Sequence, residues 1–315
     1  MTRSFLRDDD LTPAEQAEVL ALAAAMKADP YATKPLAGPV TVATIYDKPT
    51  LRTQASFSSG IAELGGHSMV VDGRLAGIGA RESVADVARV LGRQAGAIVW
   101  RTFAQSAVEE MAAYAGVPVV NALTDDFHPC QLLADLLTLR EHKGNDGAEE
   151  GQSLAGLTVA FLGDAACNMG NSWALAGAMA GIHVRFGAPE GCTPAPEVLD
   201  RAEEIAATTG GSITLDTDPL KAVAGADVLV TDTWVSMGKE EEKAAREALF
   251  GPYALTAELV DHAAPDAVVM HCLPAYRGKE IAAEVLDGPR SVVWDEAENR
   301  RHAQKAILAF LWERR

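Results

Sequence analysis

Two hydrophobic patterns alternate along the first half of the chain. Short runs of β-branched and apolar residues are typical of buried parallel strands, whereas apolar residues at helical spacing predict helices. The predicted strands are residues 40–46, 68–72, 97–101 and 119–122. The predicted helices are residues 12–27, 83–92 and 132–142, with a further helix that begins near residue 52. This alternation predicts a parallel sheet that is covered by helices on both faces.

The same alternation returns in the second half. Strands are predicted at residues 157–162, 182–186, 212–215, 227–231, 267–271 and 291–294, and helices at 174–181, 196–209 and about 298–312. Residues 143–151 are polar, rich in glycine and without periodicity, which is typical of a linker. We therefore expect an α/β protein of two domains, residues 1–147 and 148–297, each with a mainly parallel sheet and helices on both faces. The final helix, about residues 298–315, is expected to return to the first domain.

Local signals indicate where several helices begin and end. Thr12 and Glu15 stand in capping-box order around a proline at the first helical position. Ser83 and Asp86 occupy capping positions of a later helix, and the pair Gly65-Gly66 predicts the end of the helix that begins near residue 52. These signals concern structure and point to no chemistry.

The composition adds limits on function. The chain has 315 residues, of which 48% are hydrophobic, enough for one large or two medium cores. Its net charge of −17 disfavours nucleic acid and anionic membrane surfaces as partners, so an anionic substrate needs a local cluster of cationic side chains. The four cysteines show no CxxC motif and no metal-ligand spacing, which favours a reducing cytoplasm over a zinc site. Because there is no leader pattern and no apolar run of about 18 residues, we expect a soluble cytoplasmic protein.

The stretch from Tyr46 to Phe57 predicts an anion site. A strand ends, the chain turns, and a helix begins within these residues. Free N–H groups at the helix N-terminus, the hydroxyls of Thr50 and Thr53 and the Arg52 guanidinium could all bind a phosphate-sized anion. The alternative is a capped surface helix with a solvated arginine. Arg101 ends the third predicted strand, and open parallel sheets bind ligands at the carboxyl ends of their strands.

Strands of the second half end in polar clusters, which indicates a site between the two predicted sheets. Residues 162–170 stand where a dinucleotide-binding loop would, but GxGxxG is missing, so a Rossmann cofactor site is the weaker alternative. Asp232 could bind a cation, with Ser236 and Met237 at the border of its pocket, or it could cap a turn. Cys272 could be an inert core thiol, or a site residue on a backbone shaped by a cis prolyl bond.

Six motifs taken together resemble one protein family. They are Arg52-Thr53, Trp100-Arg101-Thr102, Phe127-His128-Pro129-Cys130-Gln131, Asp232 to Gly238, His271-Cys272-Leu273-Pro274 and Glu298-Asn299-Arg300. In order and spacing over nearly the whole chain, the set resembles the aspartate/ornithine carbamoyltransferases, most closely the ornithine branch of actinobacterial type. The resemblance implies two α/β domains, the first binding carbamoyl phosphate and the second binding L-ornithine. It also implies a homotrimer with sites near subunit interfaces, and neither a metal nor an organic cofactor.

The resemblance gives roles to individual residues. Those implied for carbamoyl phosphate are Thr50, Leu51, Arg52, Thr53, Arg101, His128, Gln131, Cys272, Leu273 and Arg300. Of these, the ones that hold the carbamoyl amide are Gln131, Arg300 and the Leu273 carbonyl. Those implied for L-ornithine are Asn168, Asp232, Ser236 and Met237. The implied catalytic residues are Arg101 and His128, which polarise the carbamoyl oxygen with Thr53, and Cys272, beside the attacking side-chain amine.

Four positions depart from the family pattern. Thr50 stands where the family has a serine and keeps the hydroxyl. Leu51 stands where the family has a threonine, and some carbamoyltransferases for acylated ornithines are also apolar there. Gly77 stands where a glutamine commonly reaches the phosphate site of the neighbouring subunit, so we expect that contact to be absent or to be replaced by Arg74 or Arg81. Cys167 replaces the first of two adjacent asparagines, whereas the second, Asn168, is kept.

The expected reaction is the transfer of the carbamoyl group of carbamoyl phosphate to L-ornithine, giving L-citrulline and phosphate, in arginine biosynthesis. Two alternatives stay open: a carbamoyltransferase for another amine, such as an acylated ornithine or putrescine, and a carbamoyltransferase-like protein without activity. Asp232, which would recognise a free α-amino group, speaks against the first. Arg52, Arg101, His128 and Cys272 speak against the second.

Overall fold

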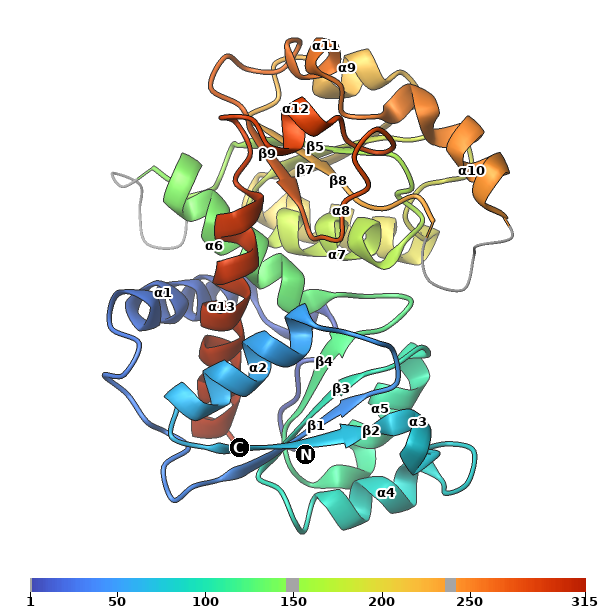
Figure 1. The fold of residues 1–315 in the computed structure, drawn as a ribbon. Coiled ribbons are helices and arrows are strands. Elements are labelled where there is room, and N and C mark those ends of the chain that lie inside the picture. Colours follow the sequence, from blue (N-terminus) through green and yellow to red (C-terminus); the bar gives the residue numbers. More distant parts are fainter. Residues whose placement is uncertain (1, 146–152, 236–241) are drawn as a thin grey trace. The chain divides into compact units, whose positions relative to one another are not determined.

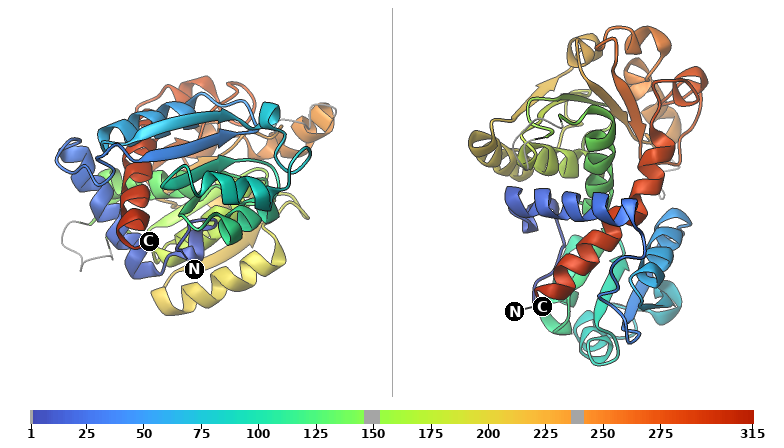
Figure 2. Two further views of the ribbon diagram at one scale, coloured as in Figure 1. Left: turned by 90° about the horizontal axis from the view of Figure 1, so that it is seen from below. Right: turned by 90° about the vertical axis from the view of Figure 1, so that its left-hand side faces the viewer.

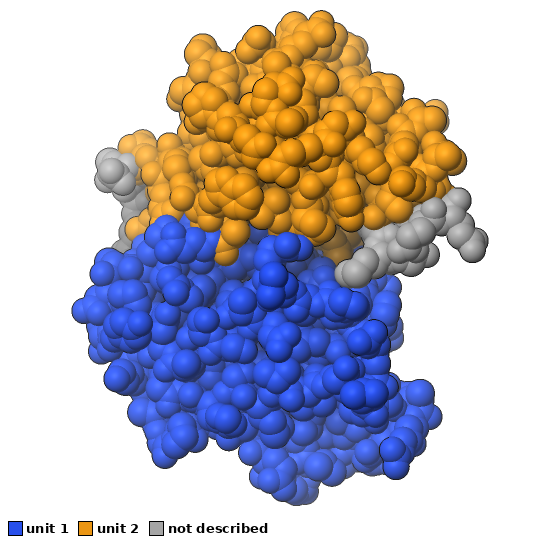
Figure 3. Space-filling model, in the orientation of Figure 1, with its two compact units in different colours: residues 1–137, 298–315 blue, residues 138–297 orange. Residues whose placement is uncertain are grey.

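The computed structural model describes residues 2–145, 153–235 and 242–315. The chain divides into two compact units, which have different colours in Figure 3: unit 1 is Met1–Leu137 with Glu298–Arg315, and unit 2 is Thr138–Ala297. The chain passes from unit 1 to unit 2 within helix α6 (Pro129–Lys143) and returns within helix α13 (Val293–Glu313). The domain boundary predicted after residue 147, and most of the predicted linker, lie outside the described residues.

Unit 1 contains a parallel sheet of four strands. They are β1 (Thr41–Tyr46), β2 (His67–Asp72), β3 (Ala97–Arg101) and β4 (Val119–Leu123), in the order β2-β1-β3-β4 (Figure 1). In the register of β1 and β3, Tyr46 lies opposite Arg101. The carboxyl ends of these two central strands therefore meet at one edge of the sheet, which we call the carboxyl edge of unit 1.

Helices cover both faces of this sheet. The helices of unit 1 are α1 (Pro13–Ala28), α2 (Arg52–Glu63), α3 (Gly73–Ala76), α4 (Val84–Leu91) and α5 (Gln105–Ala115), with a short 3-10 helix at Asp8–Asp10. Ile45 and Trp100 form a core with Val84 of α4 and Met111 of α5 on one face (Figure 2). Helix α2 and the C-terminal part of α13 lie on the other face, where Gly60 packs against Lys305.

Unit 2 contains a parallel sheet of five strands. They are β5 (Thr158–Leu162), β6 (His183–Gly187), β7 (Ser212–Asp216), β8 (Val228–Thr231) and β9 (Val268–His271), in the order β7-β6-β5-β8-β9. Its helices are α7 (Asn168–Met179), α8 (Pro196–Thr209), α9 (Pro219–Val223), α10 (Lys243–Phe250), α11 (Ala257–Val260) and α12 (Ala283–Leu286), with a 3-10 helix at Gly251–Tyr253. Leu162, Leu229 and Val269 face a core with Val223 of α9 and Leu259 of α11.

The predicted fold class is confirmed, since both sheets are parallel and carry helices, and the C-terminal helix returns to unit 1. One predicted strand is wrong. Within residues 291–294 only Ser291 forms an isolated bridge, to Val269, and Val293 already begins α13. The two valines suggested a strand, but Asp295 and Glu296 suit the first turn of a helix, where the dipole favours negative charge.

Several predicted helices begin earlier in the structure. Helix α6 begins at Pro129 rather than residue 132, α7 at Asn168 rather than residue 174, and α13 at Val293 rather than residue 298. The first turns of α6 and α7 contain polar residues such as Gln131 and Asn168, which are typical of loops, whereas α13 begins within the predicted strand at residues 291–294. None of the described helices combines the length and the apolar character that crossing a membrane requires.

Candidate active site

The N-terminus of α2 lies at the carboxyl edge of unit 1. Residues 47–51 connect β1 to α2, whose N-cap residue is Leu51. A leucine cannot accept a hydrogen bond, so α2 begins without a side-chain cap. Leu51 is 78% exposed. The first N–H groups of α2 and its positive dipole end are therefore free to bind an anion, as the sequence predicts.

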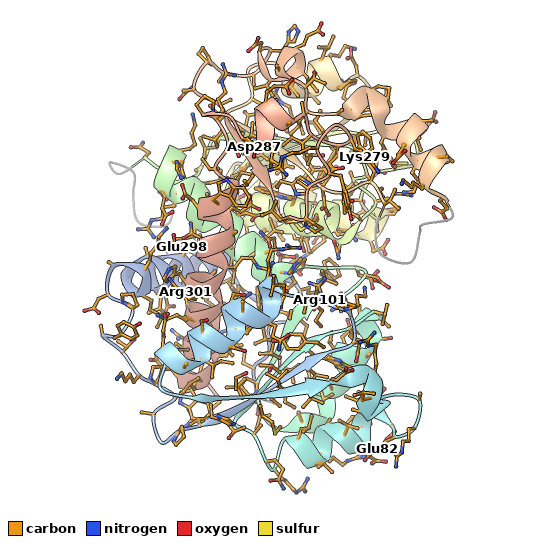
Figure 4. All side chains as sticks on the ribbon, viewed as in Figure 1. Glu82, Arg101, Lys279, Asp287, Glu298 and Arg301 are labelled. Atoms are coloured by element: carbon orange, nitrogen blue, oxygen red, sulfur yellow. The ribbon has the colours of Figure 1, made fainter. Side chains whose placement is uncertain are left out.

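Thr53 lies in the first turn of α2, and its hydroxyl contacts two arginines from other elements. Thr53 is fully buried, and its Oγ1 atom accepts hydrogen bonds from Arg101 Nη1 at 3.2 Å and from Arg300 Nη2 at 2.8 Å. Arg101 ends β3 (Figure 4), whereas Arg300 lies in α13, near the other end of the sequence. The structure therefore brings three predicted site residues into direct contact, with two positive charges beside the helix N-terminus.

His128 belongs to the same edge, in the loop between β4 and α6. Its side chain is buried, and its pKa lies well below the ordinary value, first because of burial and then because of the positive charges of Arg300, Arg101 and Lys48. The imidazole is therefore neutral at pH 7 and can donate one N–H bond to a carbonyl oxygen. A neutral donor surrounded by cations suits a developing oxyanion.

Gln131 lies in the first turn of α6, just beyond His128. Its backbone N–H donates to the His128 carbonyl at 2.9 Å, and its side-chain amide nitrogen donates to Asp135 Oδ1 at 2.8 Å. Both side chains are buried. The carboxylate of Asp135 therefore orients the Gln131 amide, which fixes where its carbonyl oxygen points.

A buried polar network shapes the loop that carries His128. The Thr124 hydroxyl donates to Gln105 Oε1 at 2.8 Å and accepts the Phe127 N–H at 3.1 Å. The Leu6 carbonyl accepts from Gln105 Nε2 at 3.2 Å and from Asn121 Nδ2 at 2.8 Å. Sequence reasoning missed these residues, because single polar residues inside apolar runs carry no signal before their partners are known.

Two further residues of the loop after β1 were also missed. Asp47 Oδ2 accepts the indole N–H of Trp100 at 2.8 Å, and a Cβ atom at Gly73 would collide with the Asp47 carboxylate. Lys48 forms an ion pair with Asp125 at 2.5 Å. A polar pair directly after a buried strand was the available signal, since loops at strand carboxyl ends build ligand sites.

In unit 2, Asp232 directly follows β8 and forms a hydrogen bond with Cys272. Asp232 Oδ1 accepts from the Cys272 thiol at 3.2 Å and from the Thr233 N–H at 2.7 Å. Burial raises the pKa of Asp232, while His271 and these two hydrogen bonds act in the opposite direction. A partly buried carboxylate with this balance favours a cationic ligand, which would stabilise its charged form.

The segment from His271 to Leu273 is held by its own side chain and by two glutamates. His271 Nδ1 accepts the Leu273 N–H at 2.9 Å, so the proton of the neutral ring is on Nε2, which faces Glu280 at 3.3 Å. The His271 N–H donates to Glu296 at 2.9 Å. Leu273 has a φ of 58°, a conformation that leucine rarely adopts, so these bonds hold a strained backbone beside Cys272.

The same residues form a candidate metal cluster. Ligand atoms of Asp232, His271 and Cys272 lie within 4.8 Å of one another. However, both ring nitrogens of His271 already have partners in Leu273 and Glu280, and the Cys272 thiol donates to Asp232. The cluster is thus satisfied by hydrogen bonds within unit 2.

The remaining residues predicted for ornithine are placed as follows. Asn168 is half-buried at the first position of α7, next to the N-cap residue Cys167. Burial and the charges of Asp232 and Asp164 raise the pKa of the Cys167 thiol, so this cysteine stays protonated and unreactive. Ser236 and Met237 lie outside the described residues.

Arg246 was missed by sequence reasoning, although it contacts the loops after β5 and β8. Its guanidinium pairs with Asp164, in the loop that precedes Asn168, and its Nε atom donates to the Trp234 carbonyl at 2.5 Å. Arg246 thereby couples the loop of Asn168 to the loop of Asp232. Its neighbours along the chain are mostly charged or alanine, so the local sequence carries no signal for these contacts.

The backbone conformation at position 77 explains why a glycine stands there. It ends α3 in the left-handed conformation, with a φ of 67°, and a Cβ atom there would lie 3.0 Å from Arg81 Cβ. A side chain at this position would be strained. The Arg74 side chain is largely exposed, and its Nε atom lies 3.8 Å from Asp72 Oδ1.

Comparisons with known proteins add independent findings. Residues 3–141 match the family model "Aspartate/ornithine carbamoyltransferase, carbamoyl-P binding domain", and residues 155–311 match "Aspartate/ornithine carbamoyltransferase, Asp/Orn binding domain". The chain is 60% identical over 311 residues to a curated ornithine carbamoyltransferase of Clavibacter michiganensis, covering 99% of each.

Solved structures agree with these matches. The ornithine carbamoyltransferase of Pyrococcus furiosus has a TM-score of 0.91 and 42% identity, over 98% of this chain and 96% of that one. The anabolic ornithine carbamoyltransferase of Campylobacter jejuni has a TM-score of 0.92 and 33% identity, over 99% of this chain and 100% of that one.

Proposed function

The chain belongs to the aspartate/ornithine carbamoyltransferase family and is a carbamoyltransferase, and from that premise we propose that L-ornithine is its amine substrate. The carbamoyl group of carbamoyl phosphate passes to the side-chain amine of L-ornithine, and the products are L-citrulline and phosphate. The observation that carries this proposal is the Thr53 hydroxyl, which gathers Arg101 and Arg300 beside the neutral His128. These groups match an acyl phosphate, which combines a phosphate anion with a carbonyl oxygen to be polarised.

The chemistry needs fixed positive groups more than it needs a reactive side chain. The uncharged amine attacks the carbonyl carbon, a C–N bond forms, and a tetrahedral oxyanion collapses as the C–O bond to phosphate breaks. Arg52 and the first N–H groups of α2 bind the phosphate, whose charge increases as it leaves. Arg101, Thr53 and His128 stabilise the oxyanion. Most of the rate enhancement then comes from positioning and electrostatics.

Unit 2 supplies the recognition of the amino acid. Asp232 binds the α-ammonium group of L-ornithine, which relieves the cost of a buried carboxylate. Asn168 binds the α-carboxylate, and Cys272 lies beside the side-chain amine. Ser236 and Met237 complete this set by family resemblance. The amine must lose a proton before it attacks, so the rate is expected to rise with pH below the pKa of ornithine's side chain.

One observation favours a different amine. Leu51 is apolar, as in some carbamoyltransferases for acylated ornithines. The Leu51 side chain is 78% exposed, however, and an acylated α-amino group would offer Asp232 no cationic partner. We therefore keep free L-ornithine as the substrate. We also propose a homotrimer, a cytoplasmic location and the biosynthetic direction, the last supported by the anabolic relative from Campylobacter jejuni.

A panel of four amines tests the substrate. We expect L-ornithine to be the best substrate, and putrescine and N-acetylornithine to be poorer by roughly two to four orders of magnitude in kcat/KM, the range for sites whose polar groups lose their partners. Lysine keeps both recognition groups but is one methylene longer, so it is expected to bind and react poorly. A kcat/KM for putrescine or N-acetylornithine at or above that of ornithine would overturn the assignment.

A further inference from the structure

Lys48 makes two contacts with neighbouring loops at the carboxyl edge of unit 1. Its Nζ atom lies 2.5 Å from Asp125 Oδ1, in the loop after β4, and 4.4 Å from the ring centre of Phe103, in the loop after β3. Lys48 itself belongs to the loop after β1, which leads into α2. The Lys48 side chain therefore connects its own loop to the loops after β3 and β4.

The burial of these side chains is unequal. The Lys48 side chain is only 11% exposed, whereas Phe103 is 52% exposed and the Asp125 side chain 61% exposed. An exposed ion pair contributes little, because water screens it and both side chains lose freedom. Here most of the Lys48 side chain is buried, and its ammonium also lies over an aromatic face, which adds a second favourable contact.

The backbone around Lys48 connects the same loops. The Asp125 N–H donates to the Phe103 carbonyl at 2.7 Å, and the Thr102 N–H donates to the Leu123 carbonyl at 3.0 Å. The Asp47 N–H donates to the Arg101 carbonyl at 2.9 Å. Because Arg101 and His128 belong to these loops, a shift of Asp125 or Phe103 would move both. The positive charge of Lys48 also contributes to the lowered pKa of His128, so it lies close enough to act on that side chain.

We propose that Lys48 is a positioning residue for carbamoyl phosphate: held by Asp125 and Phe103, it fixes the loop before α2 relative to the loops of Arg101 and His128. This inference rests on the proposed function. It differs from a direct role, in which the ammonium would leave Asp125 and bind the phosphate. In the direct role Asp125 competes with the substrate, whereas in the positioning role Asp125 assists it.

Two substitutions separate these roles. Lys48→Met keeps the length of the side chain and removes its charge, and Asp125→Asn removes the charged partner. We expect each to raise the Kd for inorganic phosphate, measured by calorimetry, and the KM for carbamoyl phosphate by about tenfold, the effect of losing one charge-assisted contact. The double variant is expected to be no worse than the poorer single variant, because both remove one interaction. The KM for ornithine should stay within about twofold of the wild-type value.

Further variants make the result specific. Lys48→Arg keeps a cation for Asp125 and for the Phe103 ring and is expected to restore most of the affinity. Lys34→Met and Glu109→Gln remove one exposed charge each from unit 1, outside this contact, and should leave both constants unchanged. Tighter phosphate binding in Asp125→Asn would overturn the positioning role, and so would additive losses in the double variant or no loss in either single variant.

Wild-type measurements separate this inference from the proposed function. If the wild type forms citrulline and binds phosphate while the variants match it, the role of Lys48 is wrong and the function stands. If the wild type binds phosphate with the expected dependence on Lys48 but carbamoylates none of the four amines, the substrate assignment is wrong and the role of Lys48 in anion binding stands.

Discussion

Thr53 is the residue on which the geometry of the anion site depends. Its hydroxyl is the common acceptor for Arg101 and Arg300, and the second of these lies 247 residues away in the sequence. The sequence predicts a hydroxyl, a helix N-terminus and an arginine at this place, because all of them fall within one short stretch. It does not predict that one hydroxyl orients two guanidiniums, since that follows only from the packing of α13 in unit 1.

The first prediction concerns Arg101. Arg101→Ala removes a cation that faces developing negative charge, so we expect kcat/KM for carbamoyl phosphate to fall by roughly 3 kcal/mol in transition-state stabilisation, which is more than a hundredfold. Steady-state kinetics measures the loss. Arg93→Ala is the matched control, because Arg93 is an exposed arginine of unit 1 outside the site. A variant with kcat/KM near the wild-type value would contradict the role of Arg101.

The second prediction concerns the pH dependence of stability at His128. Its pKa in the folded protein lies well below the value near 6.5 of an unfolded chain. Between these two values the unfolded state binds more protons, so the contribution of His128 to stability is complete above about pH 7.5 and is lost as the pH falls below about 6.5.

His128→Gln, which does not titrate, isolates this contribution. We expect the difference in unfolding free energy, wild type minus variant, to decrease by up to about 1.4 kcal/mol for each pH unit below 6.5. Urea unfolding of both proteins at pH 7.5, 6.5 and 5.5 measures it. Taking the difference cancels the contribution of every other titrating group that the substitution leaves unchanged. A difference that stays constant over this range would mean that His128 is not held neutral.

At the scale of elements, α13 and α2 are joined by buried charges. Lys305 Nζ lies 2.7 Å from Glu63 Oε2 and 2.8 Å from the Pro30 carbonyl, and its side chain is fully buried. Arg301, labelled in Figure 4, pairs with Glu63 at 3.2 Å but is 34% exposed. The same glutamate therefore has one buried and one solvated partner.

The third prediction compares these two partners. Lys305→Met removes the buried cation, and we expect the unfolding free energy to fall by about 3 kcal/mol, the effect of breaking a buried ion pair from one side. Arg301→Met removes the solvated one and is expected to cost less than about 1 kcal/mol. Urea unfolding measures both. Equal losses in the two variants would mean that burial does not set the strength of the pairs.

The boundaries of elements show where sequence patterns suffice. Helix α8 (Pro196–Thr209) and strand β3 (Ala97–Arg101) begin and end where predicted, because proline, glycine and β-branched residues mark their ends locally. Residues 291–294 were misread because two valines carry the strand signal, while the helix they begin is stabilised by packing further along α13. Lys305 is a similar case, since a lysine within a helix predicts a surface position and only the fold buries it.

The candidate site residues likewise divide into those that a local sequence pattern marks and those that it does not. Asp232 and Cys272 stand directly after strands, Arg101 ends a strand, and His128 lies in the loop after β4. The expectation that ligands gather at the carboxyl ends of strands therefore selects all four. Lys48 and Arg246 were not selected. Their function depends on contacts with loops 55 to 82 residues away, such as Phe103 and Asp164, and no local pattern encodes such contacts.

At the scale of the whole molecule, the fourth prediction concerns assembly. A homotrimer of chains of 33.2 kDa has a mass of about 100 kDa, and light scattering of the active protein should give this mass or a multiple of it. Leu51 and Leu75, both in unit 1, are 78% and 82% exposed. Apolar residues that lie at a subunit interface are exposed in this way when a chain is considered alone. A fully active monomer at assay concentration would contradict the trimer.

The same assembly bears on Gly77, which contributes no side chain. We expect Arg74→Ala or Arg81→Ala to lower activity more than Arg93→Ala does, because one of the two arginines would supply the charge that reaches the neighbouring subunit. If all three variants kept the wild-type rate, neither arginine would compensate for the glycine.

The division of unit 1 into two separate stretches of sequence has a consequence for biosynthesis on the ribosome. Residues 138–297 form unit 2 as one continuous segment, whereas unit 1 needs the last 18 residues, Glu298–Arg315, which bring Arg300, Lys305 and the buried Phe310. Translation proceeds from the N-terminus, so unit 1 is begun first but is completed only after unit 2. Part of the apolar face of the nascent unit 1 sheet therefore stays exposed until synthesis ends. Unit 2, in contrast, can fold as soon as it leaves the exit tunnel.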